Sequence, residues 1–351
     1  MISKYRDHYC GKLTEKEIGT KVKVAGFVEN IRDHGGVIFV DIRDMSGVIQ
    51  VVSNDDHIFD GITRESSITI EGTIRKREED DYNPRITTGT IELLVDDLKV
   101  LGKAQNILPF EVMTSKEVAE DVRLKYRYLD MRNPKVRENI IFRTKVIDYL
   151  RKIMKEDEFL EVQTPILTAS SPEGARDFIV PSRKFHGKFY ALPQAPQQFK
   201  QLLMCGGIDK YFQIAPCFRD EDARSDRVYG EFYQLDLEMA FATEEDVLEV
   251  GEKVFYETFK EFAPTKKLSE KPFVRLSYKE SMERFGTDKP DLRNPLELID
   301  LEAISSTTIP FTVTPLNGRN VVSSNTSVKS INSRGFLKSG LSVPNLSIDS
   351  L

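Results

Sequence analysis

A run of charged residues near position 220 is the first feature that could do chemistry. It reads Arg219-Asp-Glu-Asp-Ala-Arg-Ser-Asp-Arg227 and lies between two apolar segments, which predicts a charged loop joining two strands. Arginine offers a planar fork of donors that fits a carboxylate or a phosphate. The commoner role of such an arginine is a surface ion pair, here with Asp220 or Asp222, which contributes little to stability.

The strand that follows this loop has two different faces. Its apolar face is predicted to join the core and comprises Tyr233, Leu235, Leu237, Met239 and Phe241. The opposite face carries an aromatic ring, an amide and two carboxylates, which belong to Phe232, Gln234, Asp236 and Glu238. A solvated face is the default interpretation, but this composition is unusual for plain exposure and indicates a possible site.

Elements that could position this strand follow from apolar periodicity and from capping residues. A helix is predicted from Pro134 to about Met154, with Asn133 as its cap, and a later helix is capped by Thr243. The segment Phe159–Pro165 breaks the helical period, because its proline can neither continue a helix nor donate to a strand ladder. The other predicted elements are the strands Tyr211–Phe218 and Glu231–Phe241 and the helices Pro196–Cys205 and Glu244–Phe262.

The first hundred residues predict a small β barrel. Five short strands are separated by Gly or polar turns, at Val22–Val28, Val37–Arg43, Val48–Val52, Ser67–Ile74 and Thr90–Val95. Alternation places Phe39 on the face opposite Ile38 and Val40. The five-stranded oligonucleotide-binding barrel stacks unpaired bases on such an aromatic residue, whereas Phe39 could equally cover a second small core.

Composition limits the class of protein. The 351 residues are 40% hydrophobic and 30% charged, which indicates two or three globular domains. The sequence has no run of the ~18 apolar residues that a membrane helix needs, and its start lacks the apolar stretch of a secretory signal. We therefore expect a cytoplasmic protein without a membrane segment. Three cysteines and four histidines without metal-ligand spacing predict neither a disulfide framework nor a structural metal. The net charge of −6 argues weakly against nucleic acid, but it does not decide the matter.

Longer motifs in this chain resemble those of class II aminoacyl-tRNA synthetases. Tyr211–Asp222 with Glu231–Glu238 looks like motif 2 of that class, and Phe159–Pro165 looks like motif 1, whose proline lies at the dimer interface. The family is narrowed to bacterial aspartyl-tRNA synthetases by four further segments, Arg127–Arg132, Ser171–Phe178, Leu192–Lys200 and Asp288–Pro295. The resemblance covers about residues 5 to 303.

This resemblance implies an α+β fold with three functional parts. An oligonucleotide-binding (OB-fold) anticodon domain is expected over 1–102, a hinge over 103–132, and a catalytic core with a mainly antiparallel sheet over 133–300. Residues 301–351 contain 11 Ser and six charged residues, so we expect little packed structure there. The relatives are homodimers, so the resemblance also implies a second copy as partner.

Roles for individual residues also come from the resemblance. Arg219 would bridge the carboxylate of L-aspartate and the α-phosphate of ATP, and Lys200 would bind the aspartate side chain with help from Asp236. Glu173 and Gln197 would lie near the ammonium group. The aspartate site would also include Gln198 and Phe199, and the ATP site would include Asp220, Glu221 and the ring of Phe232.

The family pattern continues beyond what we find in this sequence. Motif 3 supplies further arginines and acidic groups near Mg²⁺, and none of these is found before Leu351, so we expect an incomplete active site. Val228 stands where many relatives have a glutamine that contacts the nucleotide, and Gly230 suggests a slightly longer loop. A noncatalytic tRNA-binding remnant, and an asparaginyl- or lysyl-tRNA synthetase, are the alternatives.

Anticodon recognition is expected on the barrel. By resemblance, Phe39 stacks on an anticodon base while Arg32 and Gln50 donate or accept hydrogen bonds. His34 and Gly89 resemble the relaxed branch of the family, which charges both tRNA(Asp) and tRNA(Asn); a loop histidine and a turn glycine are the plain alternatives.

Overall fold

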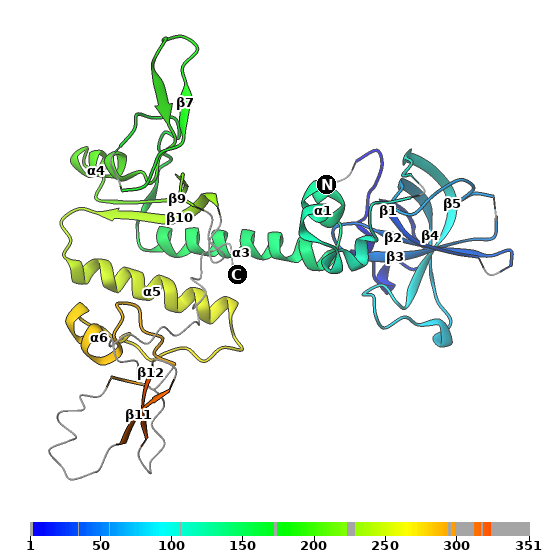
Figure 1. Cartoon of the computed structure of the whole chain (residues 1–351). Helices are drawn as coiled ribbons and strands as arrows, with labels where there is room; N and C mark the ends of the chain where they lie inside the picture. Colours follow the sequence, from blue (N-terminus) through cyan, green and yellow to red (C-terminus); the bar gives the residue numbers. More distant parts are fainter. Residues whose placement is uncertain are drawn as a thin grey trace. The chain divides into compact units, whose positions relative to one another are not determined.

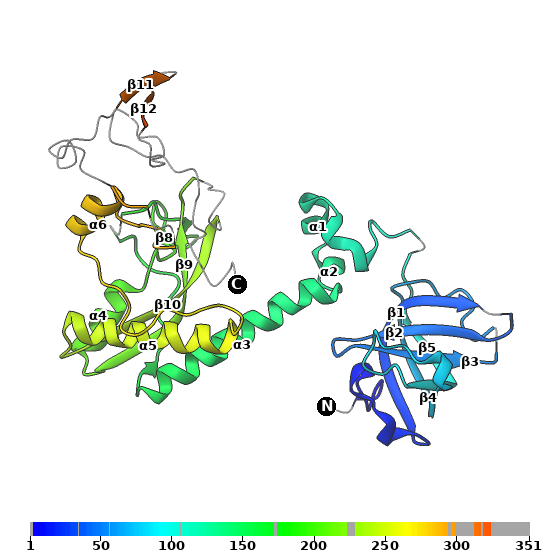
Figure 2. The same cartoon turned by 90° about the horizontal axis from the view of Figure 1, so that it is seen from below.

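Two compact units make up the chain, Met1–Glu138 and Asn139–Leu351. The computed structural model describes residues 3–33, 35–55, 57–105, 107–171, 174–222, 229–293 and 296–298, and the backbone of 312–316 and 319–323. Figures 1 and 2 show the elements of each unit from two directions.

The first unit contains a closed five-stranded barrel, which confirms the predicted fold of the N-terminal hundred residues. Its strands follow one another in the order β1-β2-β3-β5-β4, and β3 pairs with β5 in parallel. Alternate residues point inward and form a core of Val, Ile and Leu side chains that are at most a few per cent exposed. The strands are β1 Lys21–Asp33, β2 Ile38–Arg43, β3 Val48–Ser53, β4 Ser67–Lys76 and β5 Ile91–Gly102.

Short helices lie before, between and after the barrel strands in the sequence. The three-residue 3₁₀ helices are η1 Cys10–Lys12, η2 Glu15–Glu17 and η3 Glu79–Asp81. The predicted hinge segment packs within the first unit and holds η4 Val112–Glu117, α1 Glu120–Lys125 and α2 Arg127–Asp130.

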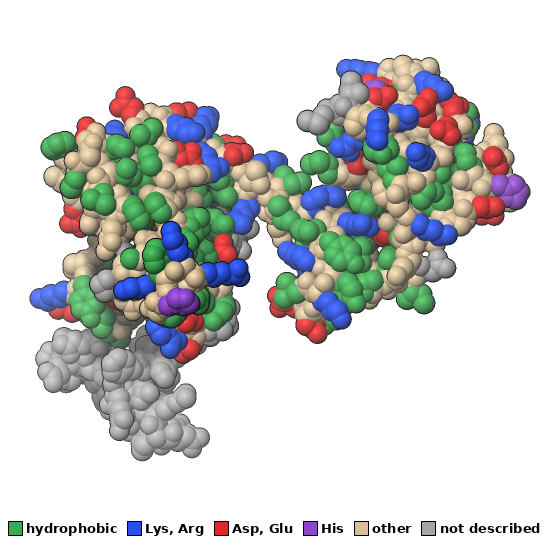
Figure 3. Space-filling model, turned by 90° about the horizontal axis from the view of Figure 1, so that it is seen from above, with side chains coloured by type: hydrophobic (Ala, Val, Ile, Leu, Met, Phe, Trp, Pro, Cys, Tyr) green, Lys and Arg blue, Asp and Glu red, His purple; other side chains and the backbone are tan. Residues whose placement is uncertain are grey.

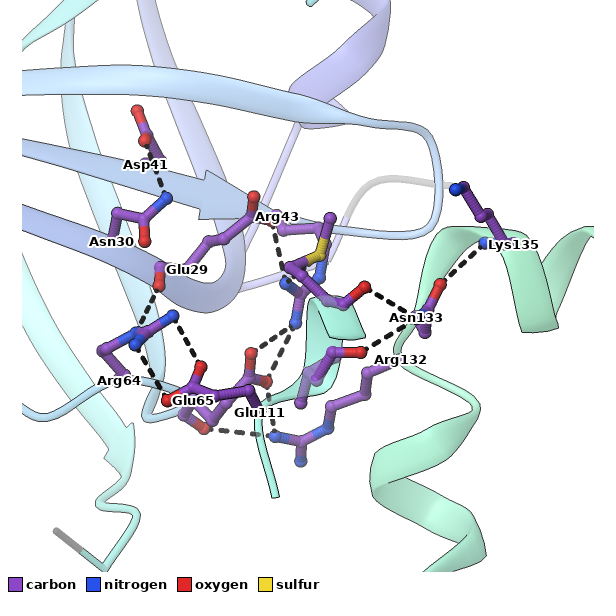
Figure 4. Close-up of polar contacts among 12 residues, drawn as sticks. Glu29, Asn30, Asp41, Arg43, Arg64, Glu65, Glu111, Arg132, Asn133 and Lys135 are labelled. Atoms are coloured by element: carbon purple, nitrogen blue, oxygen red, sulfur yellow. Dashed lines mark hydrogen bonds and ion pairs between the residues drawn. The ribbon is translucent and has the colours of Figure 1, made fainter. Parts of the chain in front are cut away.

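Buried charges bind the hinge to the barrel (Figure 4). Arg43 is 1% exposed, and its guanidinium donates to both carboxylate oxygens of Glu65 at 2.7 and 2.9 Å and to Glu29 at 2.8 Å. From the hinge, Arg132 reaches the same Glu65 carboxylate at 3.0 Å and stacks over Phe27 at 3.7 Å from the ring centroid. Removing one partner from such a buried set would leave an uncompensated charge, which costs about 3–5 kcal/mol.

Helix α3, Pro134–Glu156, begins at the end of the hinge. Asn133 accepts a hydrogen bond from the Lys135 backbone amide at 2.9 Å, as predicted for its cap. The asparagine amide also donates to the carbonyls of Val112 and Met113, so the same side chain starts the helix and holds η4.

The second unit is built on a three-stranded sheet in the order β10-β9-β6. Its strands are β6 Leu160–Glu161, β9 Lys210–Arg219 and β10 Gly230–Met239, with β9 parallel to β6 and antiparallel to β10. Helix α3 and helix α5, Glu244–Phe262, supply most of the apolar core on one face, around Leu150, Met154, Phe212 and Val254.

Smaller elements complete this unit. A hairpin is formed by β7 Ile179–Pro181 and β8 Phe189–Ala191, and α4 spans Gln197–Cys205. Helix α6, Tyr278–Phe285, follows α5. The strands β11 Thr312–Leu316 and β12 Arg319–Ser323 pair antiparallel, a hairpin that the composition of the Ser-rich segment did not predict.

Two expectations for core residues were wrong. Phe241 was predicted on the core face of the second strand, but the strand ends at Met239, and Phe241 has φ of 54° and is 99% exposed. Tyr233 was predicted on the same face and is 37% exposed. Apolar periodicity alone does not show where a strand turns away or which face has no neighbour.

Candidate functional site

The pairing of β9 with β10 brings the predicted polar residues together. The register places Phe232 opposite Cys217, Asp236 opposite Gln213, and Glu238 opposite Tyr211. Phe232, Gln234, Asp236 and Glu238 therefore share one face, as alternation predicted, while Leu235, Leu237 and Met239 pack on the core. Helix α4 contacts both strands.

Lys200 of α4 lies between the two carboxylates of β10. Its Nζ is 3.0 Å from Asp236 Oδ1 and 3.2 Å from Glu238 Oε2, and the side chains of Lys200 and Asp236 are only 12% and 8% exposed. Burial acts to lower the pKa of Lys200, but the hydrogen bonds and charges of Asp236 and Glu238 outweigh it and raise that pKa above its ordinary value. Lys200 is thus a fixed cation.

The pKa of Asp236 is shifted by the opposite balance of effects. Burial raises its pKa above the ordinary value, and Lys200 opposes that rise. Its second oxygen, Oδ2, is buried and makes no hydrogen bond with a described residue. The nearby Tyr211 hydroxyl donates instead to Gln213 Oε1 at 2.9 Å, and burial raises the tyrosine pKa.

Gln213 connects the sheet to the segment that resembles motif 1. Its Oε1 accepts hydrogen bonds from the Thr164 amide at 3.2 Å and the Thr164 hydroxyl at 3.0 Å, in addition to Tyr211. Because Gln213 is opposite Asp236 in the register, these bonds fix the backbone beside the lysine site.

Arg219 lies at the end of β9, and its guanidinium is 4.9 Å from the centroid of the Phe232 ring. Among the described residues, Arg219 makes no ion pair with Asp220 or Asp222. The surface ion pair considered in the sequence analysis is therefore not formed. Asp222 lies 3.7 Å from Arg176 instead, and the Asp220 amide donates to the Arg176 carbonyl at 2.9 Å.

Gln194 was missed by sequence reasoning and organises the loop before the hairpin. It is 2% exposed; its Oε1 accepts from the Ala175 amide at 3.0 Å, and its Nε2 donates to the Ala175 carbonyl at 2.7 Å and to Asp177 at 2.6 Å. Its position in the segment Leu192–Lys200 could have identified Gln194, but only the fold shows which glutamine of that segment is buried. Gln197 and Phe199 are half-buried in α4, and Gln198 is exposed.

Other predicted residues of this site stand as follows. Asp220 and Glu221 are half-buried at the start of the charged loop. Glu173 and Val228 lie outside the described residues. No three His, Cys, Asp or Glu side chains converge as possible metal ligands within the described part of the chain.

A polar network covers the barrel face that was expected to read RNA. Arg32 donates to Asp41 at 2.9 Å and to Gln50 at 3.1 Å, and Gln50 donates in turn to Glu92 at 2.8 Å. Phe39 is half-buried and lies outside the buried barrel core.

Glu92 was a further residue that sequence reasoning missed. It is 6% exposed, and Arg75 donates to its Oε1 at 2.7 Å. Strand alternation could have identified Glu92, because Ile91 and Leu93 belong to the barrel core and the residue between them must face outward.

Gly89 has a structural reason for being glycine. A Cβ atom there would lie 1.8 Å from the carbonyl oxygen of Asn83, whose amide donates to the Gly89 carbonyl. The tight turn 83–89 therefore supports the plain interpretation of this glycine. His34 lies outside the described residues.

Comparisons with known proteins match both units. The family described as "tRNA synthetases class II (D, K and N)" matches residues 119–332, and the "OB-fold nucleic acid binding domain" matches 22–101. None of the described helices is long and apolar enough to span a membrane.

The chain is similar over most of its length to two aspartate–tRNA(Asp/Asn) ligases. It is 52% identical to that of Rickettsia bellii (strain OSU 85-389) and 53% identical to that of Orientia tsutsugamushi (strain Boryong), each over 308 residues. The matches cover 86% of this chain and 51% of each relative, so the chain spans about half the length of the curated relatives it matches.

Solved structures give the same fold. Asparaginyl-tRNA synthetase from Pyrococcus horikoshii, complexed with asparaginyl-adenylate, has a TM-score of 0.66 at 26% identity, with 80% of this chain and 66% of that chain covered. A structure titled as a putative aspartyl-tRNA synthetase from Leishmania major Friedlin has a TM-score of 0.65 at 25% identity, covering 75% and 54%.

Proposed function

This chain belongs to the class II tRNA synthetases of the D, K and N group, and from that premise we propose that it provides the anticodon barrel and the first part of the catalytic core of an aspartate–tRNA ligase. The observation that carries the proposal is the Lys200 cation held between Asp236 and Glu238 on the floor of the site. The relatives named as aspartate–tRNA(Asp/Asn) ligases support the same substrate.

Lys200 suits the side-chain carboxylate of L-aspartate. An ammonium fixed by two carboxylates keeps its charge and still has donor capacity for a third acceptor. Asparagine would place a neutral amide there and lose the attraction between opposite charges, so we expect the site to favour the acid. Gln197, Gln198, Phe199 and Glu173 would complete the pocket, with Glu173 and Gln197 near the ammonium group.

Arg219 suits the reacting phosphate. In the proposed first step, an α-carboxylate oxygen of aspartate attacks the α-phosphorus of ATP, the bond to the β-phosphate bridging oxygen breaks, and pyrophosphate leaves. Charge on the α-phosphate oxygens would be stabilised by the Arg219 fork. Phe232, which the guanidinium already covers at 4.9 Å, would stack on adenine beside Asp220 and Glu221.

The second proposed step transfers the aminoacyl group. A ribose hydroxyl at the 3′ end of the tRNA attacks the aspartyl carbonyl carbon, the bond to the phosphate oxygen breaks, and AMP leaves. The anticodon of the same tRNA would contact the barrel face at Phe39, Arg32 and Gln50. We include tRNA(Asn) with tRNA(Asp) among the substrates.

A second copy of the chain is the proposed partner at α3. A groove of about 540 Å³ lies between α3 and the motif 1-like segment and is lined by Ile140, Ile147, Ile166 and Tyr233 among others. Ile140 and Ile166 are 44% and 46% exposed, which fits a surface that a subunit covers.

Calorimetric titration with stable adenylate mimics tests the proposal. Aspartyl-sulfamoyl adenosine is expected to bind at least tenfold more tightly than the asparaginyl form. Equal affinity for the two mimics, or tighter binding of the asparaginyl form, would contradict the aspartate assignment.

A further inference from the structure

The β7–β8 hairpin is a cationic projection on an acidic chain. Its turn carries Arg183, Lys184, His186 and Lys188, all exposed. We propose that this hairpin is an RNA-binding surface for the strand of tRNA that enters the site beside Lys200 and Arg219. The inference rests on the proposed function and adds a contact surface to it.

Charge is the first observation that supports this surface. From Phe178 through Ile208 the sequence contains no Asp or Glu, although the whole chain has a net charge of −6. Among the described residues no carboxylate pairs with Arg183, Lys184 or Lys188, whereas Lys200 in the same stretch is held by two. Screening confines such charges to about 8 Å at physiological salt, so the local excess attracts a polyanion despite the acidic whole.

Exposed aromatic rings neighbour these cations in the sequence. Phe185, Phe189 and Tyr190 are 52%, 56% and 39% exposed, and the Lys184 ammonium is 5.4 Å from the Phe185 ring centroid. Figure 3 shows Lys and Arg side chains gathered with apolar ones on this face of the second unit. Cations that follow a backbone, interleaved with rings that stack on bases, are how proteins hold single-stranded nucleic acid.

The hairpin is joined directly to the site. Ala191 at the end of β8 exchanges backbone hydrogen bonds with Thr168, and the Leu192 amide donates to the Phe178 carbonyl. The Phe218 amide donates to the Pro193 carbonyl, and Arg219 is the next residue. A strand lying on the hairpin therefore leads to Arg219, where the proposed reaction needs the unpaired 3′ end.

A tRNA acceptor minihelix that has a single-stranded 3′ end and no anticodon is the probe. Its binding to the 351-residue chain is measured by fluorescence anisotropy at several salt concentrations. The triple variant Arg183→Gln, Lys184→Gln, Lys188→Gln is expected to weaken binding at least tenfold. Since each lost phosphate contact lowers the salt slope by about 0.7–0.9, the slope should fall by about 2–3.

A matched control removes the same charge elsewhere in the second unit. Lys260, Lys266 and Lys267 are exposed, and changing all three to Gln should leave the affinity within twofold of wild type. Circular dichroism checks that both variants are folded.

Several outcomes would overturn the hairpin proposal. These are unchanged affinity and slope in the triple variant, an equal loss in the control, or no minihelix binding by a chain that does bind the anticodon stem-loop. A triple variant that loses self-association but keeps minihelix binding would assign the hairpin to a subunit contact and also overturn it. Failure to bind any tRNA(Asp) fragment would instead contradict the proposed function.

Discussion

At the scale of single residues, the site is defined by where charge is buried. Lys200 and Asp236 are both nearly inaccessible, yet Glu238 adds a second negative charge to one positive charge. The two carboxylates keep the lysine protonated, while burial, with a smaller contribution from the Glu238 charge, raises the pKa of Asp236. A ligand carboxylate would therefore bind the Lys200 ammonium against the repulsion of two fixed carboxylates. Binding then requires that an N–H of the ammonium points toward the ligand.

Replacing Lys200 by Met is expected to abolish the choice between acid and amide. The variant should bind aspartyl- and asparaginyl-sulfamoyl adenosine within about threefold of each other, because the only cation assigned to the side chain is gone. Calorimetry with both mimics measures the ratio. Lys260→Met, an exposed lysine of α5, is the control and should keep the wild-type ratio. A K200M variant that retains the preference would remove Lys200 from this role.

The pKa direction of Lys200 gives a separate prediction. A raised lysine pKa means that the proton is lost only above the ordinary value of 10.5, so the cation is present throughout pH 7–9. The preference for the aspartyl mimic should be constant within about twofold over that range. A steady fall of the preference between pH 7 and pH 9 would show that the pKa of Lys200 is lowered rather than raised, and would contradict this prediction.

At the scale of elements, the hinge is organised around one buried carboxylate. Asp130 is fully buried; Ser115 donates to it at 2.8 Å, and Arg123 donates to both of its oxygens at 3.1 Å, with Arg127 as a further partner. Burial acts to raise the pKa of Asp130, but the bonds from Arg123 and Ser115 outweigh it and lower that pKa. One side chain thus connects η4, α1 and α2.

Asp130→Asn should destabilise the hinge by about 1.5–3 kcal/mol at pH 7, the usual contribution of hydrogen bonds to a charged group. Because the native pKa lies below the unfolded one, the stabilisation is present above about pH 4 and is lost as pH falls through the native pKa. The difference between variant and wild type should therefore shrink in acid. Hydrogen exchange of amides 112–133 measures it, with exposed Asp121→Asn on α1 as the control.

Sequence patterns predicted the elements well and the long-range contacts poorly. Glu244–Phe262 was predicted to the residue, since Thr243 forms a capping box with Asp246 and the apolar period is regular. The Arg43, Glu65 and Arg132 network could not be predicted, because its members are far apart in sequence and nothing local distinguishes a buried arginine from an exposed one. The same reason hid Gln194 among neighbouring glutamines.

At the scale of the whole molecule, self-association is expected through the groove beside α3. Ile140→Asp would place a charge in a covered apolar surface, so the dimer dissociation constant should rise about a hundredfold. Sedimentation velocity over a concentration series measures it. Val274→Asp, at a residue that is 71% exposed outside the groove, should leave the association unchanged. A wild-type chain that stays monomeric at all concentrations would contradict the proposed partner.

Recognition of two tRNAs is the remaining property of the whole molecule. The anticodons of tRNA(Asp) and tRNA(Asn) differ at one position, so the barrel must either read that base or ignore it. On the described face, Arg32, Gln50 and Glu92 are already bonded to one another, which fixes their donors and acceptors in advance. The turn at Gly89 admits no side chain without moving Asn83.

We therefore expect this chain to bind both anticodons with similar affinity. Two anticodon stem-loops that differ only at the distinguishing base are titrated against the chain, and their dissociation constants should agree within tenfold. Phe39→Ala should weaken both equally, by about 1–3 kcal/mol, because stacking on a ring does not depend on which base is stacked. A wild-type preference for the tRNA(Asp) loop of about a hundredfold, a gap of about 2.7 kcal/mol, would show that the barrel reads the base. In that case Gly89 would be fixed by its turn alone, since its contact with Asn83 is sufficient to require glycine there.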